Sequence, residues 1–133
     1  MRLPVLLAAV GLSLLLAAPG QAYTMFSSPS GNIGCVIGKP GARCDIAKRS
    51  WRPPPKPRWC PFDWGQGLSI ARHGRGRYVC AGDTTLGSHR VLAYGEAIRR
   101  ERFRCVSRKS GIRCVNRRTG HGFLISRERA RRF

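Results

Sequence analysis

A ten-residue pattern bounded by two cysteines occurs twice in this chain and limits the possible folds more than any other feature. The first copy, residues 35–44, reads CVIGKPGARC, and the second, residues 105–114, reads CVSRKSGIRC. Both copies keep the two cysteines and the valine, lysine, glycine and arginine between them. Pro-Gly and Ser-Gly at their centres are typical turn sequences. Each copy therefore predicts two short antiparallel strands joined by a turn.

The spacing of the cysteines predicts how they are bonded. Residues nine apart in such a hairpin face each other on neighbouring strands about 4.8 Å apart, which brings their Cα atoms within disulfide range. The predicted disulfides are Cys35–Cys44, Cys105–Cys114 and, by elimination, Cys60–Cys80. A zinc site, the alternative use of cysteines, would need spacings such as C-x-x-C that do not occur in this sequence. We therefore expect no bound metal and no cofactor.

Residues 1–22 have the pattern of a secretion signal. Arg2 is followed by an uncharged apolar run over residues 5–18. A helix of that length would span about 21 Å, which is less than the roughly 30 Å hydrocarbon core of a bilayer. Gly20 and Ala22 then provide the small residues of a cleavage site. We expect cleavage before Tyr23 and one secreted domain over residues 23–133.

The composition of residues 23–133 narrows the class of protein. They hold 24 of the 25 lysines and arginines and all six acids, a formal charge of +18. Leu, Ile, Val and Phe are only 21 of the 111 residues, a share typical of disordered chains at such a charge. Three disulfides would compensate for this low apolar content by lowering the conformational entropy of the unfolded chain. This excludes a membrane protein, a large enzyme and a cytosolic redox protein, and leaves a small basic domain, which we expect to be a monomer.

Short apolar segments between turn residues predict further strands. Their ranges are 68–71, 77–81, 91–94 and 122–126, whereas residues 96–100 are too few to assign. The proline-rich segment 48–61 favours an extended path over the surface. Ser126 is expected to cap a final helical turn that ends at Arg132. Together these segments predict an all-β fold, a small disulfide-stapled antiparallel domain that is barrel-like or two-layered.

Five sequence blocks occur in a recognisable order. They are FSSPSGNIGC (26–35), DWG (63–65), CAGDT (80–84), LAYG (92–95) and GHGF (120–123). The set resembles a family of small secreted actinobacterial proteins classed as a domain of unknown function. This resemblance covers residues 26–133 and implies export, disulfides and a single β-rich domain, but no activity and no catalytic residue. The high arginine content is a departure from the family's pattern.

The basic surface is the main functional signal. Of the 24 cations after residue 22, 20 are arginines, which bind phosphate and carboxylate groups bidentately, and 13 cations lie between Arg99 and Arg132. Such a field attracts nucleic acid, anionic wall polymers or acidic lipid headgroups. The alternative is that the charge only keeps the protein soluble. The predicted polyanion-binding residues are Arg99, Arg100, Arg102, Arg104, Arg108, Lys109, Arg113, Arg117 and Arg118.

The tryptophans have two possible roles. Trp51, Trp59 and Trp64 alternate with cations and could stack on sugars or bases. In so small a domain, however, tryptophan is also the largest available core residue. We favour packing for all three.

Catalysis is the alternative class of function. His73, His89 and His121 with Glu96 and Glu101 could serve a secreted ribonuclease, with His121 as general acid or base, but their spacing identifies no pair. Asp63 and Asp83 could serve a glycosidase, although Asp83 before two threonines is more typical of a turn cap. We therefore predict a non-enzymatic secreted domain without catalytic residues that associates with polyanions. A partner-binding structural module is a third hypothesis.

Overall fold

The computed structural model describes residues 1, 4, 11–15, 23–87 and 89–133, so most of the predicted signal peptide lies outside the described residues. Within the described residues, none forms a helix with the length and apolarity needed to cross a membrane. All regular structure in this part of the chain is β-strand.

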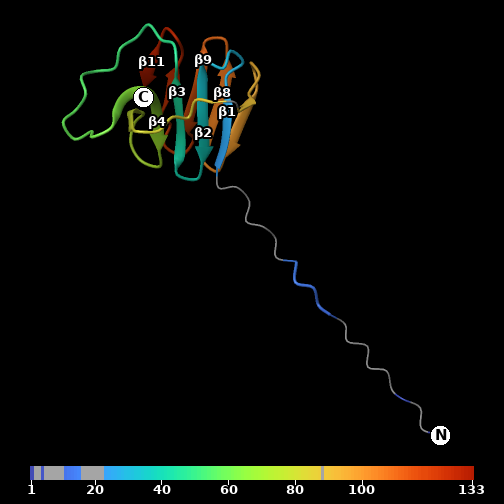
Figure 1. Cartoon of the computed structure of the whole chain (residues 1–133). Helices are drawn as coiled ribbons and strands as arrows, with labels where there is room; N and C mark the ends of the chain where they lie inside the picture. The colour runs from blue at the N-terminus through green and yellow to red at the C-terminus, as the bar shows by residue number, and fades with distance from the viewer. Residues whose placement is uncertain (2–3, 5–10, 16–22, 88) are drawn as a thin grey trace.

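Two sheets pack face to face (Figure 1). The first has the order β5-β4-β3-β2-β1-β6, with strands β1 (Tyr23–Ser27), β2 (Ile33–Gly38), β3 (Gly41–Ile46), β4 (Asp63–Ala71), β5 (Arg77–Ala81) and β6 (Arg90–Val91). The second has the order β11-β10-β9-β8-β7, with β7 (Ala97–Arg100), β8 (Phe103–Arg108), β9 (Gly111–Asn116), β10 (Gly122–Ile125) and β11 (Ala130–Arg132). All pairs are antiparallel except β1 with β6. The predicted all-β, disulfide-stapled fold is confirmed, in its two-layered form.

The two sheets repeat one motif. Strands β1–β5 and β7–β11 each form a meander in which every strand pairs with the next. The fourth strands share a further pattern, Gly-Leu-Ser-Ile at 67–70 and Gly-Phe-Leu-Ile at 122–125, and Leu68 opposes Cys44 as Phe123 opposes Cys114. A Cβ atom at the first glycine of either pattern would collide with the carbonyl oxygen of the opposing cysteine. The duplication therefore extends beyond the hairpins that the sequence reveals.

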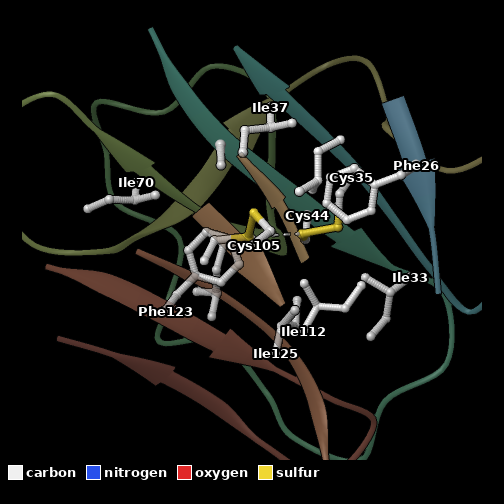
Figure 2. Packing of buried hydrophobic residues seen from close by; sticks show 14 of the residues in the cluster. Phe26, Ile33, Cys35, Ile37, Cys44, Ile70, Cys105, Ile112, Phe123 and Ile125 are labelled. Atoms are coloured by element: carbon white, nitrogen blue, oxygen red, sulfur yellow. Dashed lines mark hydrogen bonds between the residues drawn. A yellow bond between two sulfur atoms is a disulfide. The ribbon is translucent and has the colours of Figure 1, made fainter. Parts of the chain in front are cut away.

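The two hairpin disulfides lie at the centre of the core (Figure 2). Each joins Cα atoms 4.1 Å apart, and all four cysteines are fully buried. The two bonds touch, because Cys44 Sγ lies 3.9 Å from Cys114 Sγ. A third disulfide joins Cys60 to Cys80. These are the three pairs that the repeat and elimination predict.

The first half contains an insertion that the second half lacks. Twenty-two residues separate Cys44 from Gly67, compared with seven between Cys114 and Gly122. Residues 47–62 of this insertion have no regular secondary structure, and they arch away from the sheets (Figure 1). This agrees with the expectation that the prolines keep the segment out of helices and central strands.

The end of the chain differs from the prediction. The Oγ of Ser126 accepts a hydrogen bond from the N–H of Arg129 at 3.0 Å, as a helix cap would. The chain then turns back, however, and residues 130–132 pair with β10 as strand β11. The predicted helical turn is wrong because the same capping bond also closes a β-turn, and pairing with β10 decides the outcome.

Other strand boundaries also differ. Strand β4 begins at Asp63 rather than at residue 68, with an irregularity between Trp64 and Leu68 where Gly65 has a φ of 76°. Of residues 91–94 only Val91 is in a strand, because the N–H of Glu96 closes a turn on the carbonyl of Ala93. Strand β7 occupies part of the unassigned segment 96–100.

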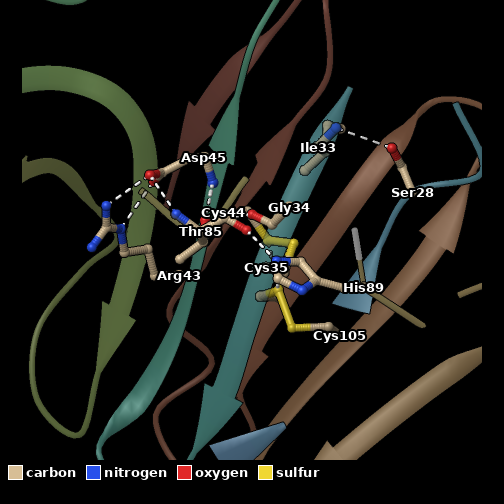
Figure 3. The surroundings of a disulfide bond; sticks show 11 residues. Ser28, Ile33, Gly34, Cys35, Arg43, Cys44, Asp45, Thr85, His89 and Cys105 are labelled. Atoms are coloured by element: carbon tan, nitrogen blue, oxygen red, sulfur yellow. Dashed lines mark hydrogen bonds and ion pairs between the residues drawn. A yellow bond between two sulfur atoms is a disulfide. The ribbon is translucent and has the colours of Figure 1, made fainter. Parts of the chain in front are cut away.

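A segment after β5, residues 82–87, covers the outer face of the first sheet (Figure 3). The buried carboxylate of Asp45 accepts a hydrogen bond from the N–H of Thr85 at 3.1 Å. The hydroxyl of Thr85 accepts one from the N–H of Asp45 at 3.1 Å and donates one to the carbonyl of Gly34 at 2.6 Å. Arg43 reaches both Asp45 at 2.7 Å and Asp83 at 2.8 Å. The predicted turn-cap role of Asp83 is therefore wrong, because its carboxylate binds Arg43.

We expect Gly34→Ala to destabilise the protein by about 1–3 kcal/mol, because the new Cβ would collide with the carbonyl oxygen of Thr85 and displace the covering segment. Gly82→Ala is the matched control, since its Cβ would meet only Phe62 Cδ1 at 3.6 Å, an ordinary contact. Its effect should stay below about 0.5 kcal/mol. Urea unfolding measures both. Equal stability of the two variants would contradict this packing.

The Arg43–Asp83 pair predicts a pH dependence of stability. The hydrogen bond and charge of Arg43 lower the pKa of Asp83 below its ordinary value of 3.8. A carboxyl with a lowered pKa in the folded state stabilises the fold above its unfolded pKa, and that contribution is lost as the pH falls through the folded value. Asp83→Asn should therefore reduce the urea midpoint at pH 6 and have no effect at about pH 2.

Asp63→Asn removes the same charge from an exposed position and controls for net charge. A deficit of the Asp83 variant that is equally large at both pH values would rule out this ionic contribution.

Candidate functional site

The nine predicted polyanion-binding residues do not form one site. Neighbouring strands run in opposite directions, so the turns after β7 and β9 lie at one end of the sandwich and the turn after β8 lies at the other. Arg99, Arg102, Arg117 and Arg118 line a hollow at the first end, and Arg108 and Lys109 line a hollow at the second. Arg104 and Arg113 lie between the two ends on the outer face of the second sheet. Arg100 turns toward β1, where its Nε donates to Thr24 Oγ1 at 3.0 Å.

The first end, which we call the arginine end, is a hollow of about 630 Å³ lined by Arg99, Glu101, Arg102, Arg117 and Arg118. Its two turns are bonded together, because the N–H of Arg117 donates to the carbonyl of Arg102 at 2.8 Å. Arg99 Nε also donates to the carbonyl of Glu101 at 3.0 Å. Glu101 has a φ of 50°, which non-glycine residues rarely adopt. These contacts fix the backbone of the two turns from which the arginine side chains extend.

Asn116 attaches a third turn to the arginine end. Its fully buried side chain donates from Nδ2 to the carbonyls of Ala71 and Arg72 at 3.2 and 3.1 Å. Its Oδ1 accepts a hydrogen bond from the N–H of Arg118 at 3.0 Å. Arg72 is thereby held near the hollow, with Nη1 3.8 Å from Glu101 Oε2. Neither Asn116 nor Arg72 was predicted from the sequence, since only the paired sheets bring these turns together.

Electrostatics at the arginine end favour a bound anion. Desolvation, and then the charges of Arg118 and Arg72, lower the pKa of Arg102, and Glu101 opposes this only in part. A lowered pKa means that the neighbours disfavour the positive charge of Arg102. A phosphate, sulfate or carboxylate in the hollow would relieve this repulsion. Within the described part of the chain, the hollow therefore combines several unpaired positive charges with only one acid, Glu101.

The outer face of the second sheet continues the basic surface. Arg99 opposes Arg104 across β7 and β8, so the arginine end and this face are contiguous. Cross-strand pairing also places Val106 opposite Arg113, and Leu124 between Arg113 and Arg131. Because side chains alternate along each strand, these residues share the outer face. It thus presents arginines separated by aliphatic side chains.

The second hollow, which we call the motif-end hollow, has a volume of about 530 Å³. Parts of the first and fourth of the five sequence blocks line it. The SPSGN block (residues 28–32, within the first block) contributes residues 28 and 30–32, the adjoining Ile33 also lines the hollow, and the LAYG block contributes Tyr94. Its charged residues are Lys48, Arg108, Lys109, Arg127 and Glu128. Lys48 and Arg127 were not predicted, because they belong to the insertion and to the β10–β11 turn, and only the fold brings them beside Arg108.

The tryptophans divide between two environments. Trp51 packs against the core, and Trp64 lies 6.0 Å from the ring of Tyr78, as expected for packing residues. Trp59 is 69 % exposed and meets Trp64 only in an edge contact at 5.6 Å. The expectation that Trp59 is a core residue is therefore wrong, because the insertion carries it away from the sheets.

The catalytic candidates have other partners. A ring nitrogen of His89 lies 2.9 Å from the carbonyl of Thr85 (Figure 3), and the backbone N–H of His121 donates to Thr119 Oγ1 at 3.3 Å. In the part of the chain described, no ion pair joins a histidine to Glu96 or Glu101, and no cluster of histidine, cysteine and acidic residues is arranged to hold a metal.

Fold and surface together define a duplicated, disulfide-stapled β-sandwich with basic hollows at both ends. The chain belongs to a family of unknown function, DUF6636, whose profile matches residues 5–133. No curated protein and no solved structure matches it.

Arginine crowding predicts a trade-off between stability and binding. Arg118→Gln should raise the thermal midpoint at low ionic strength, because it removes a charge that disfavours Arg102, and about 0.5 M NaCl should diminish the gain by screening. Sulfate should stabilise the original protein more than the variant. Thermal melts followed by circular dichroism measure both effects. Arg58→Gln, on the insertion, is the control, and a lower midpoint for Arg118→Gln at low salt would contradict the crowding.

Proposed function

We propose that this protein is an exported, non-enzymatic domain that associates with polyanions at the cell envelope or outside the cell. The observation that supports this most directly is the arginine end, where Arg99, Arg102, Arg117 and Arg118 surround one hollow. Desolvation and the charges of Arg118 and Arg72 together lower the pKa of Arg102, so the folded state disfavours the positive charge of Arg102. A bound anion supplies the missing opposite charge.

The balance of charges over the domain supports the same proposal. Among the described residues there are three ion pairs, and on the cationic side these use only Arg43 and Arg72. In the described part of the chain, the other arginines at the arginine end and on the outer face of the second sheet form no ion pair, although Arg99 bonds the carbonyl of Glu101 and Arg113 lies over the ring of Phe133. Their contiguity suits an extended polymer, which can contact several cations at once, better than a single small anion.

The proposed location rests on different features. The predicted signal over residues 1–22 favours export, and three disulfides suit an oxidising compartment. In such a compartment a basic domain would meet the anionic polymers of the envelope. A basic domain would be retained there by charge.

Association through phosphate or sulfate contacts predicts a steep dependence on salt. Each cation that neutralises a phosphate releases counterions, so log Kd changes linearly with log salt concentration, by about 0.7–0.9 per contact. We expect an RNA oligomer to bind at about 50 mM NaCl and to dissociate by about 500 mM. Arg102→Gln/Arg118→Gln should lower the slope by about 1–2 and weaken binding similarly for all sequences. Fluorescence anisotropy measures both quantities.

Lys56→Gln/Arg58→Gln removes the same charge from exposed positions of the insertion and controls for a general loss of charge. Failure of the original protein to bind RNA or heparin at about 50 mM NaCl would exclude the proposed function. Equal slopes for the two double variants would show that the arginine end is not the contact site.

A further inference from the structure

We infer that the opposite end of the sandwich carries a separate groove for a linear acidic polysaccharide, a chain of sugars bearing carboxylate or sulfate groups. This inference rests on the proposed function, because it also requires a polyanionic ligand. It adds a second site, formed by other residues, and a ligand class.

Two hollows join to form this groove. The motif-end hollow, of about 530 Å³, shares Ala47, Lys48 and Arg127 with a neighbouring hollow of about 630 Å³ that extends to Trp51 and Arg52. The shared residues place the two hollows side by side, with Tyr94 lining the first and Arg52 lining the second. An elongated groove of this kind fits several units of a linear polymer better than one small molecule.

The lining of the groove is strongly cationic. It contains six cations and one acid, namely Lys48, Arg49, Arg52, Arg108, Lys109, Arg127 and Glu128. In the described part of the chain, none of the six cations forms an ion pair. Arginine and lysine at intervals along a groove provide bidentate and point contacts for successive anionic groups. The groove therefore selects for repeated negative charge.

The walls of the groove are held in place before any ligand binds. Asn32, from the SPSGN block, accepts a hydrogen bond from the N–H of Lys48 at 2.7 Å and donates one to its carbonyl at 2.9 Å. The N–H of Ser50 donates to the carbonyl of Arg127 at 2.8 Å, and Trp51 Nε1 donates to the carbonyl of Ser126 at 2.8 Å. These bonds fasten the insertion to the β10–β11 turn along the groove. A preorganised site loses less conformational entropy on binding.

The insertion itself points to a function for the groove. The two halves of the sandwich share their core strands, but only the first half has the long segment between its third and fourth strands. That segment supplies Lys48, Arg49 and Arg52 to the groove. The part of the chain that breaks the duplication therefore forms one wall of the site.

The aromatic residues favour a polysaccharide over a single-stranded nucleic acid. Proteins that bind single strands gain much of their affinity from bases stacked on aromatic rings. The ring of Trp51 already has the guanidinium of Arg49 4.8 Å from its centroid and the ring of Tyr78 at 6.3 Å. Tyr94 is 49 % exposed and lines the groove with the hydroxyl of Ser30. Charge and hydroxyl contacts thus dominate over stacking, as suits a chain of acidic sugars.

The test compares two double variants by isothermal titration calorimetry at about 100 mM NaCl. Lys48→Ala/Arg127→Ala removes two side chains of the groove, and the groove's walls use only backbone groups of these residues. Lys56→Ala/Arg58→Ala removes the same charge from exposed positions of the insertion that line neither hollow. The probes are a heparin octasaccharide, an octagalacturonate, a neutral maltooctaose and a thymidine decanucleotide. Circular dichroism checks that both variants are folded.

We expect the groove variant to bind heparin octasaccharide and octagalacturonate at least tenfold more weakly than the original protein. The Lys56→Ala/Arg58→Ala variant should lose less than about threefold, and maltooctaose should not bind. A heparin response without an octagalacturonate response would restrict the ligand to sulfated chains.

Equal losses in the two variants would overturn the groove and leave the proposed function intact, since charge alone would then explain binding. If the decanucleotide bound more tightly than the acidic sugars and with the same loss in the groove variant, the polysaccharide assignment would be wrong. If the original protein bound none of the anionic probes, both the groove and the proposed function would fail.

Discussion

The two hairpin disulfides packed against each other at the centre of the sandwich are the interaction on which the rest of the structure depends. Their sulfur atoms meet 3.9 Å apart between the sheets, where a larger domain would place leucine and phenylalanine side chains. Closing a ten-residue loop removes about 2–3 kcal/mol of chain entropy from the unfolded state for each bond. This contribution lets a chain with few bulky apolar residues and a large positive charge keep a fixed fold. The two buried disulfides therefore offset the destabilising repulsion among the surface arginines.

Duplication explains the core, and the departures from duplication explain the surface. Both halves keep the meander, the central disulfide and the glycine that lets the fourth strand approach the third. Only the first half has the long insertion, which is tied to β5 by Cys60–Cys80, and the covering segment 82–87. The insertion lines the motif-end hollow and the hollow beside it. The second half, by contrast, leaves its outer face open and lined with arginines.

The features that the sequence predicts well are local, and those that it misses depend on pairing between distant strands. The cysteine repeat contains its own turn, so both hairpins and their two disulfides follow from spacing, and Cys60–Cys80 follows by elimination. Strands β1 and β7 are short, and each is stabilised by pairing with the first strand of a cysteine hairpin, β2 or β8. Ser126 makes the predicted capping bond, but pairing with β10 converts the expected helical turn into β11. The predicted cations are likewise divided between two ends because strand direction alternates, and Asn116, Lys48 and Arg127 acquire their roles only in the folded chain.

Reductive unfolding of residues 23–133 tests most directly whether the fold depends on the central disulfides. We predict that peptide mapping of the oxidised protein finds Cys35–Cys44, Cys60–Cys80 and Cys105–Cys114. The fully reduced protein should then be unfolded near room temperature and show no cooperative thermal transition, as judged by near-ultraviolet circular dichroism. A reduced protein that still unfolds cooperatively well above room temperature, or a bond between Cys35 and either Cys105 or Cys114, would contradict the account.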